Sequence, residues 1–576
     1  MTLLCLVNFS GDIGIIGLGA RGLFVLEQLY SSLSRKRDSQ KIHTCIFETT
    51  ESYGTGRAWD PEQAQVTISN ISDRALDTLH ERLPFEYRGA TIPAYPSYHQ
   101  WLKQEFDLEI VPSKDSYSTR QRLGGYLNER GTSIVLPLQN LGVVTIKSEE
   151  VLELNKHAEE LVLKTDKNEY AFKNVVLALG HLSTRPDSLR KDLMDHAERF
   201  DLNYCKNPYS SKAKTLLQNS ENVIIKGFGL TMIDLMHIAI EKSVGSFETK
   251  PDSVFLEYVG DHDTVLIPYS LDGLPMVPKP IGKKLDDVFE TVSLGRDQMI
   301  ADLKKDIQEG NIDSIDQILK PIATLICKAY QRFEEKYSNA DLTADAAENL
   351  IVEWLKYQKV SNPHIIDVQM NAYEYLKIAC EMANGLRPFS LDYTIGQIWR
   401  ELQIDMYYLY TYDLLPKSVV SEFSRIEDQT KRYSFGPPLR SMMEMLALVE
   451  AGVINLDFVK LPEITVDSYG YHLSKNGNRI TSLNFIDSVL DKPNYDIMID
   501  PLMESLTQHQ LVEAFDDHMG IHVDAQGSHV VDSQTIDGLY SIGRNCKGSL
   551  FGTDSIIDCF SEDVTQSMIQ SIIADL

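Results

Sequence analysis

The sequence has few cysteines and no long hydrophobic run. Its 576 residues include seven cysteines, an odd number that forms no C-x-x-C pair. This scattered pattern excludes a disulfide framework, so we predict a reduced chain, no metal site and a cytoplasmic location. No stretch approaches the about 18 apolar residues of a membrane-spanning helix. The opening MTLLCLVNF lacks a basic flank, and we interpret it as a short leader to a first β-strand rather than a signal peptide.

Basic residues are also scarce. Lys and Arg number 55 against 83 Asp and Glu, which gives a net charge of −28. An acidic surface repels phosphate backbones and anionic lipid, so we expect a small-molecule substrate and neither nucleic acid nor a membrane as partner. Any anionic ligand must then be held by backbone amides or a few basic side chains. The oligomeric state stays open.

Several catalytic motifs are missing as well. The sequence contains no H-E-x-x-H, G-x-S-x-G or Walker motif, so metalloprotease, α/β-hydrolase and P-loop chemistry have no support. No catalytic residue can be named from the sequence.

The length suggests roughly three to four domain-sized units, and the chain shows three textures. Short Val/Ile/Leu runs alternate with helical periodicity and glycine turns from residue 12 to about 280, as in parallel α/β units. Apolar residues at i, i+3 and i+4 then predict helices over about 284–425, and short strands return from about 465.

A dinucleotide-binding turn is present near the start of the chain. The apolar strand Asp12 to Ile16 leads directly into GLGARG (17–22), and an apolar-periodic helix follows. In such a turn Gly17 makes the bend, Gly19 lets a pyrophosphate approach the backbone, and Gly22 lets the helix pack on the strand. The helix N-terminus would present free amides to the phosphates. The next strand, 43–47, ends in Glu48, which we expect to bind the ribose hydroxyls.

A second turn of this kind lies about 210 residues further on. The strand 222–226 runs into Gly227 and Gly229, and we expect Thr231 in the place of the third glycine. Between the two turns, the strand NVVLALG ends in Gly180 and resembles the strand of two-dinucleotide flavoproteins that passes close to the first cofactor. Two turns predict one resident cofactor, FAD, and a nicotinamide that visits it.

At these residues the chain resembles the FAD/NAD(P)-binding proteins of the YdhS-like group. It is similar at the same places to flavin-dependent amino-acid N-monooxygenases, including nitrosuccinate-forming enzymes that oxidise aspartate. The resemblance rests on stretches that follow the family's order along nearly the whole chain: GLGARG (17–22), GTGRAWDPEQAQVTISN (54–70), STRQRLGGYL (118–127), VVLALG (175–180), GFGLTMID (227–234), IGQIWREL (395–402), RYSFGPPLRSMMEMLALVEAGVI (432–454) and GLYSIGRNCKGSLFGTDSI (538–556).

The resemblance implies a fold and further site residues. It implies an α/β protein with two Rossmann-like domains and a helical insertion: an FAD domain over 1–205 plus 465–576, an NAD(P) domain over 206–283 plus 426–464, and the insertion over 284–425. It places residues 54–70 along the isoalloxazine side of FAD and brings Gly543 to the flavin or its pyrophosphate. The cofactor-binding residues expected in this way, beyond those of the glycine turns, are Arg21, Gly56, Asn70, Asp234, Ser270, Asp272 and Gly543.

Three stretches depart from the family pattern. An arginine expected near the 2′-phosphate of NADPH is missing from Ser270-Leu271-Asp272, so Asp272 could instead bind the ribose of NADH or only shape its turn. The segment Arg432-Tyr433-Ser434 has lost two polar groups, and the expected second strand of the A-T-G type, Tyr495 to Asp500, has no glycine. NADH and NADPH therefore both stay open as coenzymes.

We expect an FAD-dependent, NAD(P)H-oxidising oxidoreductase, and within that class a monooxygenase acting on a small amino acid or amine. The oxygen chemistry of such enzymes belongs to the flavin, which is consistent with the missing acid–base motif. Two alternatives remain: a flavin reductase or dehydrogenase that does not activate oxygen, and a flavin-bound interaction or sensor protein.

Overall fold

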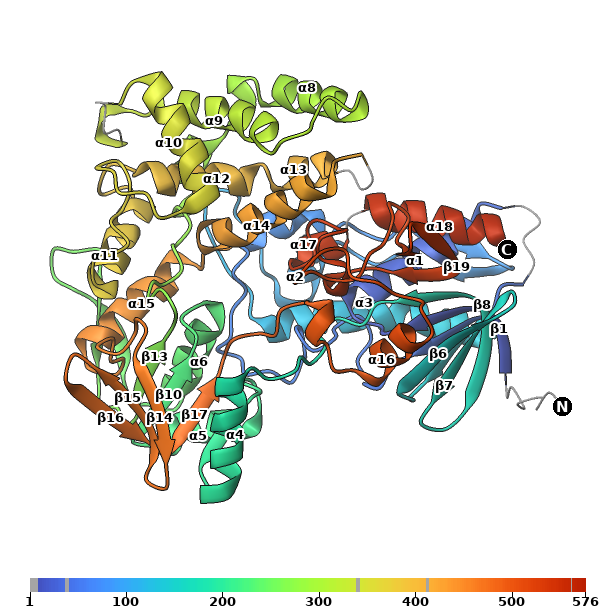
Figure 1. Ribbon diagram of the computed structural model, residues 1–576, viewed down its shortest axis with the longest axis horizontal. Helices are drawn as coiled ribbons and strands as arrows, with labels where there is room; N and C mark the ends of the chain where they lie inside the picture. Colours follow the sequence, from blue (N-terminus) through green and yellow to red (C-terminus); the bar gives the residue numbers. More distant parts are fainter. Residues whose placement is uncertain (1–8, 37–40, 338–341, 411–413, 561) are drawn as a thin grey trace.

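The computed structural model describes residues 9–36, 41–337, 342–410, 414–560 and 562–576. Two parallel β-sheets lie at different ends of the molecule, and a layer of helices stands beside them (Figure 1). The start of the chain and its C-terminal segment meet around the first sheet. The leader expected before the first strand falls on residues 1–8, outside the described residues.

The first sheet has the strand order of a dinucleotide-binding fold. Its parallel strands run in the order β19-β8-β1-β2-β5, so β1 lies between the next strand in sequence and a strand that follows much later. A ligand site is expected where neighbouring connections leave in opposite directions, at the carboxyl ends of β1 and β8. The strands are β1 (Phe9–Ile16), β2 (Thr44–Phe47), β5 (Val144–Lys147), β8 (Glu169–Leu177) and β19 (Gln534–Ser541), with β6 (Val151–His157), β7 (Glu160–Thr165) and β18 (Ser528–Val531) as antiparallel additions.

Helices from both chain ends cover this sheet. They include α1 (Ala20–Ser34), α3 (Arg120–Asn140) and α18 (Glu562–Asp575), and α18 packs on α1. Further elements of this part are η1 (Asp73–Thr78), β3 (Phe85–Tyr87), β4 (Ala90–Ile92), α2 (Tyr98–Phe106), α16 (Pro501–Gln508), η6 (Arg544–Cys546) and α17 (Ile556–Cys559).

The second sheet repeats the arrangement with fewer strands. Its parallel order is β13-β10-β17-β9, with the glycine turn after β10. The strands are β9 (Asn203–Cys205), β10 (Asn222–Lys226), β13 (Val265–Tyr269) and β17 (Asn484–Asp487), and the helices α4 (Ser188–Phe200), α5 (Ser211–Asn219) and α6 (Leu230–Ile240) belong to the same region. Small antiparallel sheets pair β11 (Ser246–Thr249) with β12 (Leu256–Val259), and β14 (Glu463–Asp467) with β15 (Gly470–Lys475) and β16 (Asn478–Ser482).

The prediction of a strand at Tyr495–Asp500 is wrong. Tyr495–Ile497 forms the 3-10 turn η5, and the strand that pairs with β10 is β17. A Cβ on Gly227 would lie 2.6 Å from the Oγ of Ser488, directly after β17, just as one on Gly17 would lie 2.5 Å from the carbonyl oxygen of Ala178, after β8. The segment after β17 is thus the counterpart of the segment that ends in Gly180.

The helical region extends beyond the predicted range. The apolar faces of these helices form one core with the second sheet. This core includes Trp354, Tyr375 and Trp399. The helices are α7 (Gly282–Asp286), η2 (Asp287–Phe289), η3 (Val292–Leu294), α8 (Arg296–Gln308), α9 (Asp316–Gln331), η4 (Glu335–Tyr337), α10 (Ala344–Tyr357), α11 (Ala372–Ala383), α12 (Leu391–Glu401), α13 (Gln403–Leu409), α14 (Lys417–Ser434) and α15 (Leu439–Glu450). None of the described helices is long and apolar enough to cross a membrane.

The division into domains remains a proposal. Because β17 pairs with β10 and β9, we propose that the second unit extends through Asp487 and that the return to the FAD unit follows that residue rather than residue 465. The strand β9 belongs to this second sheet and α14 spans residue 425, so the predicted boundaries at 205 and 425 also shift, and the one at 283 is kept.

Candidate functional site

One cavity of about 3490 Å³ lies between the two sheets and the helical region. Both glycine turns open into it, together with the carboxyl ends of β1, β2, β8, β10 and β13. Thirteen of the fifteen residues expected at the site line this cavity: Gly17, Gly19, Arg21, Glu48, Gly56, Asn70, Gly180, Gly227, Gly229, Thr231, Ser270, Asp272 and Gly543. The exceptions, Gly22 and Asp234, lie directly behind it.

The first turn is shaped by close backbone packing. Gly17 has φ +91°, and a Cβ on Gly22 would lie 2.2 Å from the carbonyl oxygen of Gly17, so neither position has room for a side chain. A Cβ on Gly19 would instead meet only Gly56, at 3.6 Å. The turn therefore keeps an open face above Gly19, where α1 begins, and a pyrophosphate fits there.

Glu48 stands at the tip of β2 beside this turn. One carboxylate oxygen accepts a hydrogen bond from the amide of Leu18 at 2.8 Å, and the other accepts one from the amide of Thr50 at 2.9 Å. These bonds, with a further one from the Thr50 hydroxyl to the second oxygen at 2.9 Å, hold the carboxylate at the cavity wall. The oxygen that binds Leu18 retains a lone pair, so Glu48 can accept a hydrogen bond from a ribose hydroxyl, as the sequence predicts.

Arg21 connects the first turn to the C-terminal segment. Its guanidinium donates to the carbonyl oxygen of Gly552 at 2.8 Å, and a Cβ on Gly543 would lie 2.8 Å from Arg21 Cδ. Arg21 also faces Asp558, whose pKa is raised to about 7 by burial although Arg21 opposes that rise. The structure therefore brings Arg21 and Gly543 together, at the edge of the cavity.

The second turn has the same layout with one difference. Gly227 has φ +118°, and a Cβ on Gly229 would meet nothing within 4 Å. The expectation for Thr231 is wrong by one position: Met232 lies three residues after Gly229, as Gly22 does after Gly19, and its side chain is fully buried. Thr231 lies in the first turn of α6 and lines the cavity.

Asp234 supports the wall of the cavity rather than its surface. The carboxylate is buried, accepts a hydrogen bond from Tyr209 at 2.7 Å and pairs with Arg120 at 3.4 Å. Arg120 and Tyr209 both line the cavity. Asp234 thereby fixes two side chains that a ligand can reach.

Asp272 has an arginine partner that the sequence did not reveal. Arg432, in the last turn of α14, forms an ion pair with the Asp272 carboxylate. The other carboxylate oxygen of Asp272 accepts the amide of Leu274 at 3.1 Å and the hydroxyl of Ser270 at 3.3 Å, so Asp272 also shapes the turn. The stretch Ser270-Leu271-Asp272 has no arginine of its own, and a residue 160 positions away in the sequence supplies one.

A group of charged residues beside Asn70 also escaped the sequence analysis. Arg74 and Arg400 both bind the carboxylate of Asp286, and Arg74 also binds Asp115 at 2.9 Å. Lys279 lies next to them, and its ammonium donates to the carbonyl oxygen of Asn70 at 2.7 Å. No short motif could reveal this group, since it is assembled from η1, α7, α12 and two loops.

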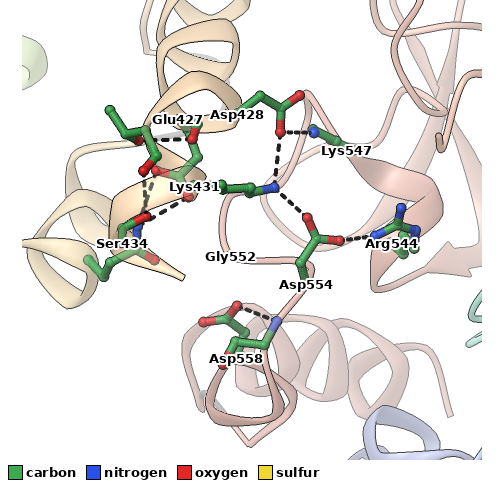
Figure 2. A network of polar contacts seen from close by, with 12 residues as sticks. Glu427, Asp428, Lys431, Ser434, Arg544, Lys547, Gly552, Asp554 and Asp558 are labelled. Atoms are coloured by element: carbon green, nitrogen blue, oxygen red, sulfur yellow. Dashed lines mark hydrogen bonds and ion pairs between the residues drawn. The ribbon is translucent and has the colours of Figure 1, made fainter. Parts of the chain in front are cut away.

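An ion network closes the cavity on the side of the C-terminal segment. Figure 2 shows Lys431 of α14 between Asp428 and Asp554, with Arg544 on the other side of Asp554. Lys547 also pairs with Asp428. The cations hold the pKa of the Asp554 carboxyl well below its usual range, although burial opposes this. The network joins the helical region to the segment after β19.

The chain is similar in sequence to known proteins. Residues 14–182 match the family model described as FAD-NAD(P)-binding. The nitrosuccinic acid synthase of Aspergillus oryzae is 21% identical over 77% of this chain and 72% of its own length. An L-aspartate N-monooxygenase (nitrosuccinate-forming) of Streptomyces davaonensis is 23% identical over 40% of this chain and 39% of its own.

Several solved structures align with nearly the whole chain. The ornithine N-hydroxylase of Kutzneria sp. 744 aligns with a TM-score of 0.45 at 11% identity, covering 98% of this chain and 99% of that one. The L-lysine 6-monooxygenase of Pseudomonas syringae aligns with a TM-score of 0.48 at 9% identity, covering 98% and 100%. The family match lies on the part of the chain that holds the first glycine turn, Glu48 and Gly180. Residues 14–182 are thus similar to an FAD-NAD(P)-binding domain, and the chain is similar to proteins named for forming nitrosuccinate.

Proposed function

We propose that this protein is an FAD-dependent, NAD(P)H-oxidising monooxygenase that hydroxylates the amino group of a small amino acid. The observation that carries the proposal is the convergence of two glycine turns on one cavity. The first turn and Glu48 fit a resident FAD, and the open second turn fits a nicotinamide dinucleotide.

The names of the two curated relatives support a narrower substrate. Both are described as forming nitrosuccinate, and one is described as acting on L-aspartate. We propose an acidic amino acid, with L-aspartate as the first substrate to test.

The described residues have separable roles in this reaction. Gly19 and Gly17 give the pyrophosphate of FAD access to the backbone, and Glu48 binds its ribose. Gly229 does the same for the nicotinamide dinucleotide. The helical region and the ion network around Lys431 cover the cavity and limit the access of water. Bound FAD supplies the redox chemistry, taking electrons from NAD(P)H and passing them to dioxygen.

Purified protein provides the test. We expect a yellow protein whose flavin is reduced by NADPH or NADH, and whose oxygen consumption rises with L-aspartate while an N-oxidised product forms. Reduction of the flavin without substrate-dependent product formation would indicate a reductase instead. Absence of bound flavin would contradict the proposal altogether.

A further inference from the structure

Among the described residues that line the cavity, Lys279 is a sheltered lysine without an ion-pair partner. Its ammonium donates a hydrogen bond to the carbonyl oxygen of Asn70. Its neighbours Arg74 and Arg400 each pair with Asp286, whereas no ion pair joins Lys279 to a carboxylate within the described residues. An ammonium has three donors, so Lys279 has donors to spare for a ligand.

The surrounding chain holds this lysine in place. The Tyr393 hydroxyl donates a hydrogen bond to the carbonyl oxygen of Pro278 at 3.1 Å. The backbone amide of Lys279 donates one to the carbonyl oxygen of Pro437 at 3.3 Å. A Cβ on Gly436 would lie 2.1 Å from the carbonyl oxygen of Val277, so the two segments touch backbone to backbone. The lysine therefore extends from a fixed segment.

The position relative to Asn70 connects the lysine to the substrate. Asn70 ends the segment 54–70 that is expected along the isoalloxazine side of FAD, and it donates from its side chain to the carbonyl oxygen of Phe435 at 3.2 Å. A group bound by Lys279 would lie beside that segment. The second glycine turn belongs to the other sheet, where Arg432 and Lys226 are the nearby cations, each already paired with an aspartate.

We propose that Lys279 binds a carboxylate of the substrate and thereby selects an acidic amino acid. The inference rests on the proposed function. It names the residue that recognises the substrate class, and nothing in the names of the relatives assigns it. Arg400 and Arg74 add positive potential nearby, while Asp286 keeps them from taking the carboxylate themselves.

The charged residues around Lys279 are consistent with its binding a carboxylate. Burial, and to a lesser extent the nearby charge of Arg400, lower the pKa of Lys279 to about 7. The charged groups that face Lys279 are Arg400, Asp286, Arg74 and Asp115. A bound carboxylate would raise the pKa again, so binding takes up a proton at a pH above 7 and weakens as the pH rises.

Calorimetry on the FAD-loaded protein tests the inference without turnover. L-Aspartate, succinate and L-asparagine are titrated into the wild type, Lys279→Met and the control Lys283→Met, whose exposed lysine pairs with Asp287. We expect Lys279→Met to bind L-aspartate and succinate at least tenfold more weakly, while Lys283→Met binds as the wild type does. Titrations at about pH 8 in two buffers of different ionisation enthalpy should show that ligand binding takes up a proton in the wild type. Lys279→Met should show no such uptake.

Other outcomes would overturn the inference. Equal affinity of wild type and Lys279→Met for both dicarboxylates would exclude the lysine from substrate binding. Loss of affinity for NADP⁺ or inorganic phosphate in Lys279→Met, with dicarboxylate binding unchanged, would assign the lysine to a phosphate instead. Reduction of the flavin by NADPH without substrate is measured in parallel, and its failure in the wild type would count against the proposed function rather than against Lys279.

Discussion

At the scale of single residues, the two glycine turns differ in where they have free space. Gly17 and Gly22 are closed by backbone oxygens, whereas Gly19 and Gly229 face the cavity. A side chain at either of the last two positions would occupy ligand space and leave the fold intact. These two residues therefore offer a matched pair of substitutions.

The substitutions Gly19→Val and Gly229→Val should give opposite defects. We expect Gly19→Val to purify folded and colourless, because valine fills the space for the pyrophosphate of FAD. Gly229→Val should retain yellow FAD and lose reduction by NAD(P)H, while dithionite still reduces the flavin. Absorbance spectra and circular dichroism check both. Loss of FAD from Gly229→Val would show that the turns do not serve separate cofactors.

Arg432 is expected to decide the coenzyme. A bare Asp272 would repel the 2′-phosphate of NADPH by on the order of 1 to 4 kcal/mol at about 4 Å, whereas its ion pair with Arg432 removes that repulsion. We expect the wild type to accept NADPH. In Arg432→Gln, the KM for NADPH should increase by a factor at least ten times larger than the KM for NADH does. Arg425→Gln, on the exposed face of α14, serves as the control. A strong preference of the wild type for NADH would contradict this role.

Lys279 should make the ligand-free protein less stable. Its pKa is about 7 in the folded chain and about 10.4 when unfolded, so the unfolded chain holds more protons between these values and stability rises with pH there. We therefore expect Lys279→Met to raise the free energy of unfolding by roughly 1 to 3 kcal/mol below pH 7, and this gain to fade toward pH 10. Denaturant unfolding at several pH values checks this. An unchanged or lower stability below pH 7 would be inconsistent with a sheltered charge.

At the scale of elements, local patterns predicted the strands that carry the turns but not the partners of those strands. β1 and β10 lie within a few residues of their expected ranges, because each is a short apolar run bounded by glycine or polar residues. The strand at Tyr495–Asp500 is expected only from the resemblance to the family's A-T-G strand, and the structure has the 3-10 turn η5 there instead. Helical periodicity was clear from 284 on, yet α14 and α15 continue to Glu450, past the predicted end.

The same limit applied to the site. Glu48 and the glycines follow a strand directly, so sequence spacing was enough to find them. Lys279 and Arg432 acquire their roles only through contacts between residues 160 or more positions apart, and no local pattern marks such contacts.

The junction between α14 and α15 is predicted to position Lys279. In Gly436→Ala the new methyl group would collide with the Val277 carbonyl oxygen, and the segment 275–281 would have to move. We expect a loss of about 1 to 3 kcal/mol in stability and a weaker affinity for L-aspartate, with FAD retained. The control Gly125→Ala, in α3, meets only Trp101 at 4.0 Å and should be neutral or stabilising. Unchanged affinity in Gly436→Ala would mean that the junction does not position the lysine.

At the scale of the whole molecule, the network in Figure 2 connects regions that the sequence separates. Asp554 binds Lys431 and Arg544, and its side chain is only 17% exposed, so its loss leaves two cations without this partner. We expect Asp554→Asn to lower the free energy of unfolding by about 2 to 4 kcal/mol at neutral pH. Because the pKa of Asp554 is depressed in the folded state, its contribution to stability is present above about pH 4 and is lost as the pH falls below it.

Asp537→Asn is the control: the side chain of Asp537 is 89% exposed, and its substitution should change stability by less than about 1 kcal/mol. An equal effect of both substitutions would argue against a structural role for the network.

The position of β19 has a consequence for the order of events during synthesis. β8 pairs with β1 on one side. On its other side β7 pairs with the first half of β8 and β19 with its last three residues, 175–177, and β19 follows β17 in the sequence. The sheet of the second unit is complete once β17, ending at Asp487, has emerged. During synthesis the second sheet, where the nicotinamide is expected, can therefore be completed first. The first sheet, where the flavin is expected, still has an unpaired edge at that time. Such an edge invites misassociation until the last segment arrives. Early availability of FAD in the expressing cell would then favour the yield of folded protein, since a ligand that binds only the finished sheet draws the nascent chain toward it.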